Sequence, residues 1–258
     1  MEIIGYFLAT LIGISLGLVG SGGSILTVPV LVYFFHIDPV LATTYSLCIV
    51  GLSSIAGVIS KYKQRLLDAK IILVFGIPSM LGVMIARKLM LPAIPANFKL
   101  FGMMSVSKSS FIMLFFATLM LASALSMILG KKNVETAEVK PNYGMTLVIV
   151  GLIEGMVTGI VGAGGGFLII PALVILGKLP MKKAIASSLF IITIKSLFGF
   201  AGDLLHTTID FKLLTSIVVL ATSGIIIGNF LNNKMEGAKL KKGFGWFVLA
   251  MSVFIFVE

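Results

Sequence analysis

A short glycine-rich stretch that occurs twice decides the fold of this chain. It reads Gly17-Leu18-Val19-Gly20-Ser21-Gly22-Gly23-Ser24 in the first half and Gly159-Ile160-Val161-Gly162-Ala163-Gly164-Gly165-Gly166 in the second. The two copies lie 142 residues apart, and a proline follows each at the same distance, at Pro29 and Pro171. The register continues without a gap as far as Leu89 and Leu231. A match of this length indicates that the chain arose by duplication.

The composition around these stretches is that of a membrane protein. The chain is 58% hydrophobic and 12% charged, with a mean hydropathy of +1.13. A soluble domain needs more charge to cover its surface. Apolar runs such as 111–129 and 143–160 approach the roughly 20 residues that cross the hydrocarbon core. The net charge is +10, and the Lys and Arg residues lie between the apolar runs, which is typical of cytoplasmic loops and lipid contacts. This distribution excludes nucleic acid binding.

Polar interruptions divide the chain into eight apolar stretches, and we expect an all-α integral membrane protein. The first and fifth stretches are too long for one crossing and carry the glycines in their middle, so each is predicted to be a helical hairpin. The other six are predicted to cross once. Met1-Glu2-Ile3 lacks the basic start of a signal peptide, so the first helix is expected to be retained. The stretches are 3–35, 39–60, 68–91, 109–130, 143–177, 182–202, 210–231 and 243–257.

The loop charges predict that the two repeats are inverted. The loop after the second stretch carries Lys61, Lys63 and Arg65, whereas its counterpart at 203–210 has no Lys or Arg. The short loop at 36–38 has none either, but its counterpart region does, and positive charge favours the cytoplasm. We therefore expect repeats at 1–130 and 142–258, joined by a polar cytoplasmic linker at 131–141. This arrangement places four basic residues on the side away from the cytoplasm, and they count against it: Arg87, Lys88, Lys99 and Lys108.

Inversion places both glycine turns near the middle of the membrane. The returning limb after the second turn, 167–177, is short and covers only about 16 Å at 1.5 Å per residue. Glycines allow the left-handed backbone that such a turn needs, and a helix N-terminus at that depth favours an anion. The alternative is that these glycines only permit close helix packing. The candidate anion-binding residues of the turns are Gly20, Ser21, Gly22, Gly23 and Ser24, and Gly162, Ala163, Gly164, Gly165 and Gly166.

Hydroxyl groups early in the helix after each hairpin could donate hydrogen bonds to an oxyanion. The alternative is that each bonds a carbonyl of its own helix. These residues are Thr43, Thr44, Ser46, Ser187 and Ser188.

Two charges, Glu154 and Lys195, lie about midway along apolar stretches, where a charge is costly and usually functional. Their repeat equivalents are Ile12 and Ser53, so neither charge belongs to the repeat. Lys195 is a candidate anion-binding residue, and Glu154 a candidate partner or carrier of a coupling proton. The alternative is a purely structural ion pair.

The remaining polar residues favour structural roles. Asp68 and Asp210 stand where helices should begin and are predicted to be N-caps. His36 and His206 are expected to be loop residues, and the single cysteine, Cys48, leaves the redox compartment undetermined. No spacing suggests a metal site, a cofactor or a catalytic triad. An intramembrane enzyme using Glu154 or His206 is therefore disfavoured, and a passive anion channel stays open as an alternative.

The chain resembles the sulfite exporter TauE/SafE family of membrane transporters. The resemblance rests on the paired glycine stretches, on 42–47 and 184–189, and on the helix starts at Asp68 and Asp210. It implies a secondary transporter in the bacterial inner membrane that moves sulfite, sulfoacetate or another organosulfonate, and a coupling proton or sodium ion is left open. Ala186-Ser187-Ser188 departs from Thr44-Tyr45-Ser46 of the first half. Lipid and the solute are the expected partners, and a homodimer is left open.

Overall fold

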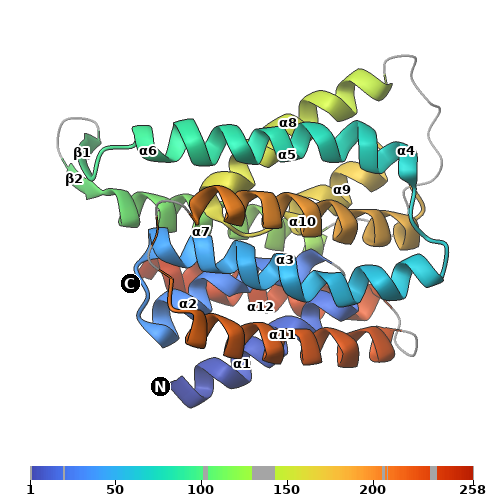
Figure 1. Ribbon diagram of the computed structural model, residues 1–258, viewed down its shortest axis with the longest axis horizontal. Coiled ribbons are helices and arrows are strands. Elements are labelled where there is room, and N and C mark those ends of the chain that lie inside the picture. The colour runs from blue at the N-terminus through green and yellow to red at the C-terminus, as the bar shows by residue number, and fades with distance from the viewer. Residues whose placement is uncertain are drawn as a thin grey trace.

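The computed structural model describes residues 2–19, 21–100, 104–129, 143–204, 207, 209–232 and 237–257. Its helices run roughly along one axis of the molecule (Figure 1). The first half contains α1 (Glu2–Val19), a 3₁₀ turn (Ser21–Leu26), α2 (Thr27–Phe35), α3 (Pro39–Lys63) and α7 (Lys108–Leu129). The second half contains α8 (Tyr143–Val161), α9 (Gly166–Ile175), α10 (Met181–Asp203), α11 (Phe211–Asn232) and α12 (Gly237–Val257). The predicted linker at 131–141 lies outside the described residues.

The third apolar stretch forms one continuous helical rod, Ala69–Ala93, with two wider π-helical segments. The rod consists of α4 (Ala69–Ile71), a π segment (Ile72–Gly76), α5 (Ile77–Ile85), a second π segment (Ala86–Met90) and α6 (Leu91–Ala93). Its repeat equivalent, α11, is a regular α-helix throughout. The π segments are therefore a difference between the halves, and such segments are frequent at functional sites.

Aspartates begin the helices as the sequence predicts. The Asp68 carboxylate accepts a hydrogen bond from Ile71 N at 3.1 Å, and that of Asp210 accepts from Lys212 N at 3.0 Å. Asp38 does the same for α3, with Pro39 at the first helical position. Each carboxylate satisfies an N–H that the helix itself leaves free.

Two short strands were not predicted. β1 (Asn97–Leu100) and β2 (Met104–Ser107) pair in antiparallel fashion between α6 and α7. Pro92 and Pro95 interrupt the helical pattern just before them, because proline cannot donate the backbone bond that a helix interior requires. The strands lie at one end of the long axis (Figure 1).

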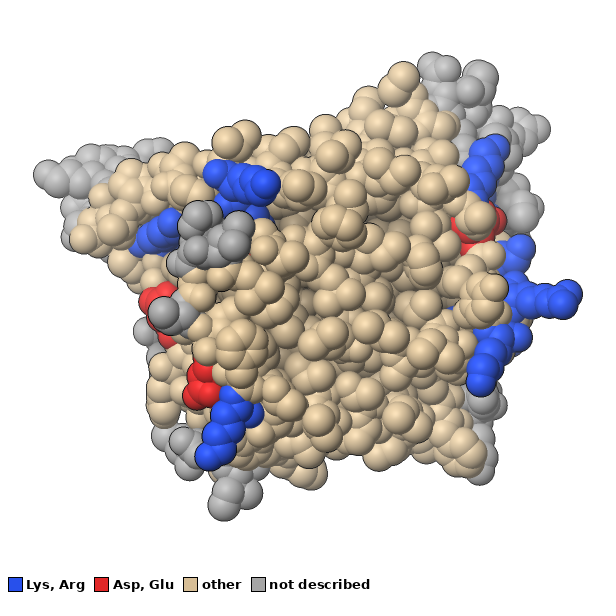
Figure 2. All heavy atoms as spheres, viewed as in Figure 1, with Lys and Arg blue, Asp and Glu red and all other residues tan. Residues whose placement is uncertain are grey.

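The described helices suit a multi-pass membrane protein. Six of them are long and apolar enough to cross a bilayer: 39–63, 69–93, 108–126, 144–161, 181–203 and 211–231. Shorter apolar helices at 4–18, 23–35 and 166–175 make up the rest of the two hairpins. On the face shown in Figure 2, Lys and Arg gather toward the two ends of the molecule, and the described surface between them carries no charged side chains. Large apolar side chains such as Leu73, Ile77 and Phe230 are exposed on the spanning helices, where lipid would cover them.

The two halves make reciprocal contacts. α1 packs on α11 in the same way that α8 packs on α5, while α3 packs on α10. Gly13 lies against the backbone of Ala221, and the equivalent Gly155 lies against the backbone of the equivalent Ser79. Each of these contacts between the halves thus recurs between the two residues that lie 142 positions away, with the halves exchanged. A two-fold relation between the repeats produces contacts of this kind. The orientation of the repeats in the membrane stays a prediction.

Candidate functional site

The two glycine turns meet in the interior of the molecule. The second turn has three glycines with left-handed backbone, Gly162, Gly164 and Gly165, with φ of 72°, 64° and 76°. A side chain on Gly164 would place its Cβ 3.3 Å from Cβ of Ser24, in the first turn. Gly162 lies directly against Thr43 of α3. The sequence thus predicted the left-handed turn correctly in the second half, and the structure brings the two turns into contact.

The first turn is built differently. Residues Ser21–Leu26 form a 3₁₀ helix, and the described positive-φ glycines all belong to the second turn. Ser24 is fully buried. Gly20, the side chain of Ser21 and the surroundings of Gly22 lie outside what the structure describes.

Glu154 and Lys195 form a buried ion pair between α8 and α10. Lys195 Nζ donates to Glu154 Oε1 at 2.5 Å and to Thr158 Oγ1 at 3.0 Å. Ser79 Oγ of α5 donates to the other carboxylate oxygen at 2.6 Å. The two charged side chains are 1% and 3% exposed. Burial of this kind is tolerated only when charges are paired and hydrogen-bonded, and here they are.

The second glycine turn lies directly on this ion pair. A Cβ on Gly165 would overlap Glu154 Oε1 and lie 2.7 Å from Lys195 Nζ. Gly165 is also the residue that precedes α9, so the carboxylate lies at the N-terminus of that helix. The positive end of the helix dipole favours an anionic group there. The pair, the turn and the helix start therefore make one site.

The predicted hydroxyl residues separate into three groups. Thr43 and Ser188 bond carbonyls of their own helices, Val40 O at 2.7 Å and Ile185 O at 2.9 Å. Ser187 Oγ accepts from Asp68 N, and Thr44 Oγ1 donates to Asp203 at 2.7 Å. Ser46 Oγ is buried and has no hydrogen-bond partner among the described residues. Contacts within the protein therefore account for four of the five hydroxyls.

Sequence reasoning missed a second buried ion pair. Arg87 Nη1 donates to Asp203 Oδ2 at 2.8 Å and to Thr44 Oγ1 at 3.3 Å, and its side chain is 2% exposed. From the sequence, Arg87 is predicted to be one of the basic residues outside the cytoplasm, and Asp203 is predicted to begin a loop. The signal was present, since Arg87 lies before the end of an apolar stretch and its repeat equivalent is the uncharged Asn229.

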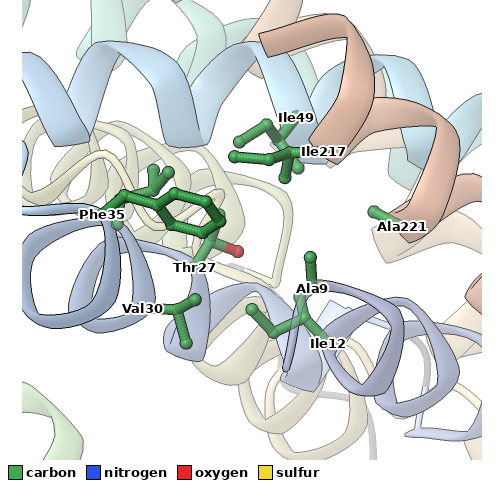
Figure 3. A pocket seen from close by; sticks show the side chains of 9 residues that line it. Ala9, Ile12, Thr27, Val30, Phe35, Ile49, Ile217 and Ala221 are labelled. Carbon is green, nitrogen blue, oxygen red and sulfur yellow. The ribbon is translucent and has the colours of Figure 1, made fainter. Parts of the chain in front are cut away.

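An apolar pocket lies away from the ion pairs, between α1, α2, α3 and α11 (Figure 3). The hydroxyl of Thr27 is the polar group among the labelled side chains, and it has no partner in the described part of the chain. None of the predicted site residues lines it. The lining residues are Ala9, Ile12, Thr27, Val30, Leu31, Phe35, Ile49, Ile217 and Ala221.

The described residues contain no group of three or more His, Cys, Asp or Glu side chains that could hold a metal ion. His206 lies outside the described residues.

The fold and site define a polytopic α-helical membrane protein with a duplicated core, a buried ion pair and glycine turns at the contact between its repeats. The family model described as "Sulfite exporter TauE/SafE" matches residues 6–255. The chain belongs to this family of membrane transporters.

Curated relatives agree with this assignment. The chain is similar to a "Probable membrane transporter protein" of Xylella fastidiosa, with 27% identity over 95% of this chain and 91% of the relative. It is also similar to the probable membrane transporter protein YdhB of Bacillus subtilis, with 26% identity over 90% of each chain. A third relative, from Methanocaldococcus jannaschii, is 25% identical over 77% of this chain and 70% of its own length. No solved structure matches the chain significantly.

Proposed function

We propose that this protein is a secondary transporter that carries a small sulfur-containing anion, such as sulfite, sulfoacetate or another organosulfonate, across the cytoplasmic membrane. The family and the names of its relatives support the transporter class. The observation that carries the proposal further is the Lys195–Glu154 pair, buried against Gly165 where the two glycine turns meet. A sulfonate needs a cation and hydrogen-bond donors in a dry site, and these are the groups found there.

The pair suggests how binding and coupling are joined. An anion that reaches Lys195 must displace the Glu154 carboxylate, because two negative charges at one buried ammonium repel each other. Protonation of Glu154 removes that repulsion, and for a singly charged anion it leaves the site with the same net charge as before. Ser79 remains able to bond the neutral carboxyl group, since its hydroxyl can donate or accept. This exchange supports a proton as the coupling ion, with sodium as the alternative.

Burial of the site favours a carrier over a passive channel. Lys195 and Glu154 are closed off in this conformation, so a solute must wait for a movement that exposes them. Inverted repeats provide such a movement by rocking one unit against the other around a central site. The reciprocal contacts of α1–α11 and α5–α8 support this arrangement.

Transport of radiolabelled sulfite and sulfoacetate in proteoliposomes tests the function. We expect saturable uptake, counterflow, and stimulation by a proton gradient. Linear uptake without counterflow would identify a channel, and a chemically altered solute would identify an enzyme.

A double variant tests the role of the pair. Glu154→Gln with Lys195→Met removes both charges and should fold, because no lone buried charge remains. We expect it to have lost transport. Ser53→Ala, at the repeat equivalent of Lys195, is the matched control and should transport normally. A double variant that folds well and transports like the wild type would show that the pair is structural.

A further inference from the structure

Two donor nitrogens of Arg87 have no hydrogen-bond partner in the described part of the chain. Nη1 holds Asp203 and Thr44, while Nε and Nη2 are buried and have no partner within the described residues. A buried donor without a partner is unfavourable unless a ligand or water completes it. The unused donors therefore need an explanation.

The two free nitrogens lie on the same edge of the guanidinium group. Nε–H and the nearer Nη2–H point in parallel, which is the arrangement that binds two oxygens of a carboxylate or phosphate side by side. A sulfonate or sulfite group presents oxygens at similar spacing. Asp203 binds Nη1 on the other side of the guanidinium group and fixes the orientation of the guanidinium plane.

A short chain of contacts connects Arg87 to the second glycine turn. Thr44, which Arg87 contacts, follows Thr43, and Thr43 lies against Gly162 of the second glycine turn. Arg87 lies toward the end of the molecule where α3 begins and α10 ends. On the predicted inverted topology, this end faces the outside.

We propose that the free edge of Arg87 is a second anion-binding site, at the outer end of the pathway to Lys195. The proposal rests on the proposed function and adds a site to it. The solute binds Arg87 in bidentate fashion before or after its exchange at Lys195, and Asp203 keeps the guanidinium in place when the site is empty.

The local backbone and the other half of the molecule support a specialised role. Arg87 lies in the π-helical segment Ala86–Met90, whereas the equivalent part of α11 is regular. The equivalents of Arg87, Asp203 and Thr44 are Asn229, Lys61 and Ala186. They carry neither a guanidinium nor a carboxylate, so the anion edge exists at one end of the duplicated core.

Direct binding tests this site without depending on transport. Sulfite and sulfoacetate are titrated into purified protein by calorimetry, for the wild type, Arg87→Lys and Lys88→Gln. Lysine keeps the charge and the contact with Asp203 but removes the bidentate edge, so we expect at least about tenfold weaker binding. Lys88 is the exposed neighbour, and its loss should change affinity little. Arg87→Lys binding as tightly as the wild type would overturn the proposal, as would a wild type that binds neither anion.

Asp203→Asn provides an independent variant that keeps the guanidinium. Removing the negative charge beside the guanidinium should tighten binding of both anions, and unchanged or weaker binding would contradict the proposal. Proteoliposome uptake of the same anions is measured in parallel. Binding that depends on Arg87 without any uptake would refute transport and leave the site. Uptake with binding that is indifferent to Arg87 would refute the site and leave transport.

Discussion

The turn at Gly165 and the turn at Gly23 occupy equivalent positions in the two repeats but face different side chains. Gly165 lies on the charged groups of Glu154 and Lys195, whereas Gly23 lies on Ser15 and the backbone of α1.

The wider surroundings differ in the same way. The equivalents of Glu154 and Ser79 are Ile12 and Ala221, which line the apolar pocket of Figure 3. The glycine contacts that pack the helices are retained in both halves, while the charged chemistry is found in one. A buried ion pair is costly, and at the two equivalent turns the described residues place one beside Gly165 and none beside Gly23.

The largest expected effect comes from breaking the pair in the half that has it. Lys195→Met leaves the Glu154 carboxylate buried without its cation and should destabilise the protein by about 3 to 5 kcal/mol. Ser53→Ala at the equivalent position should cost less than about 1 kcal/mol, because its hydroxyl makes only a long 3.4 Å bond to Val50 O. Chemical unfolding in detergent measures both. If the two variants were equally stable, the ion pair would not contribute the difference in stability that we expect between the two halves.

A smaller effect is expected from adding a methyl group to the charged turn. Gly165→Ala forces a non-glycine residue to a φ of 76° and pushes a carbon onto Glu154. We expect a loss of about 3 kcal/mol from backbone strain and overlap together, and loss of transport.

Gly202→Ala is the matched control. A Cβ there meets nothing within 4 Å, and the residue is helical, so stability should hold or rise slightly. Transport by the Gly165 variant at the wild-type rate would show that the turn does not have to approach the pair.

Removing one hydrogen bond should have a smaller effect still. Ser79→Ala takes a 2.6 Å donor from the Glu154 carboxylate and should cost about 1.5 kcal/mol, since bonds to charged groups are stronger than neutral ones. Chemical unfolding in detergent measures the loss. A Ser79→Ala variant as stable as the wild type would show that this hydrogen bond adds nothing to the stability of the pair.

Much of the architecture was predictable because bilayer crossing and duplication leave strong patterns. The hairpins, the left-handed turn at Gly162–Gly165 and the N-caps at Asp68 and Asp210 follow from composition and spacing. The contact of Glu154 with Lys195 could be anticipated from their similar depth along two stretches that are predicted to start at the same membrane face.

Other features depend on tertiary contacts that spacing does not encode. Arg87 pairs with Asp203 across the two repeats, at a distance in sequence that no local pattern links. The same holds for Thr44, whose hydroxyl bonds Asp203 instead of its own helix. The β1–β2 hairpin was missed because its strands are short and lie between prolines and a helix, where the sequence suggested only a loop.

Single cysteines can test how the two halves are oriented in the membrane, and we expect them to have little effect on stability. In a Cys48→Ala background, Gln64→Cys and Lys183→Cys should react with an impermeant maleimide only in inside-out vesicles. Thr207→Cys should react from the outside of intact spheroplasts. Gln64 and Lys183 are exposed at the end of the molecule that carries Lys61, Lys63, Lys178 and Lys182, and positive charge favours the cytoplasm. Labelling of position 183 from outside would make the repeats parallel, and the Arg87 edge would then have to be assigned to a different face of the membrane.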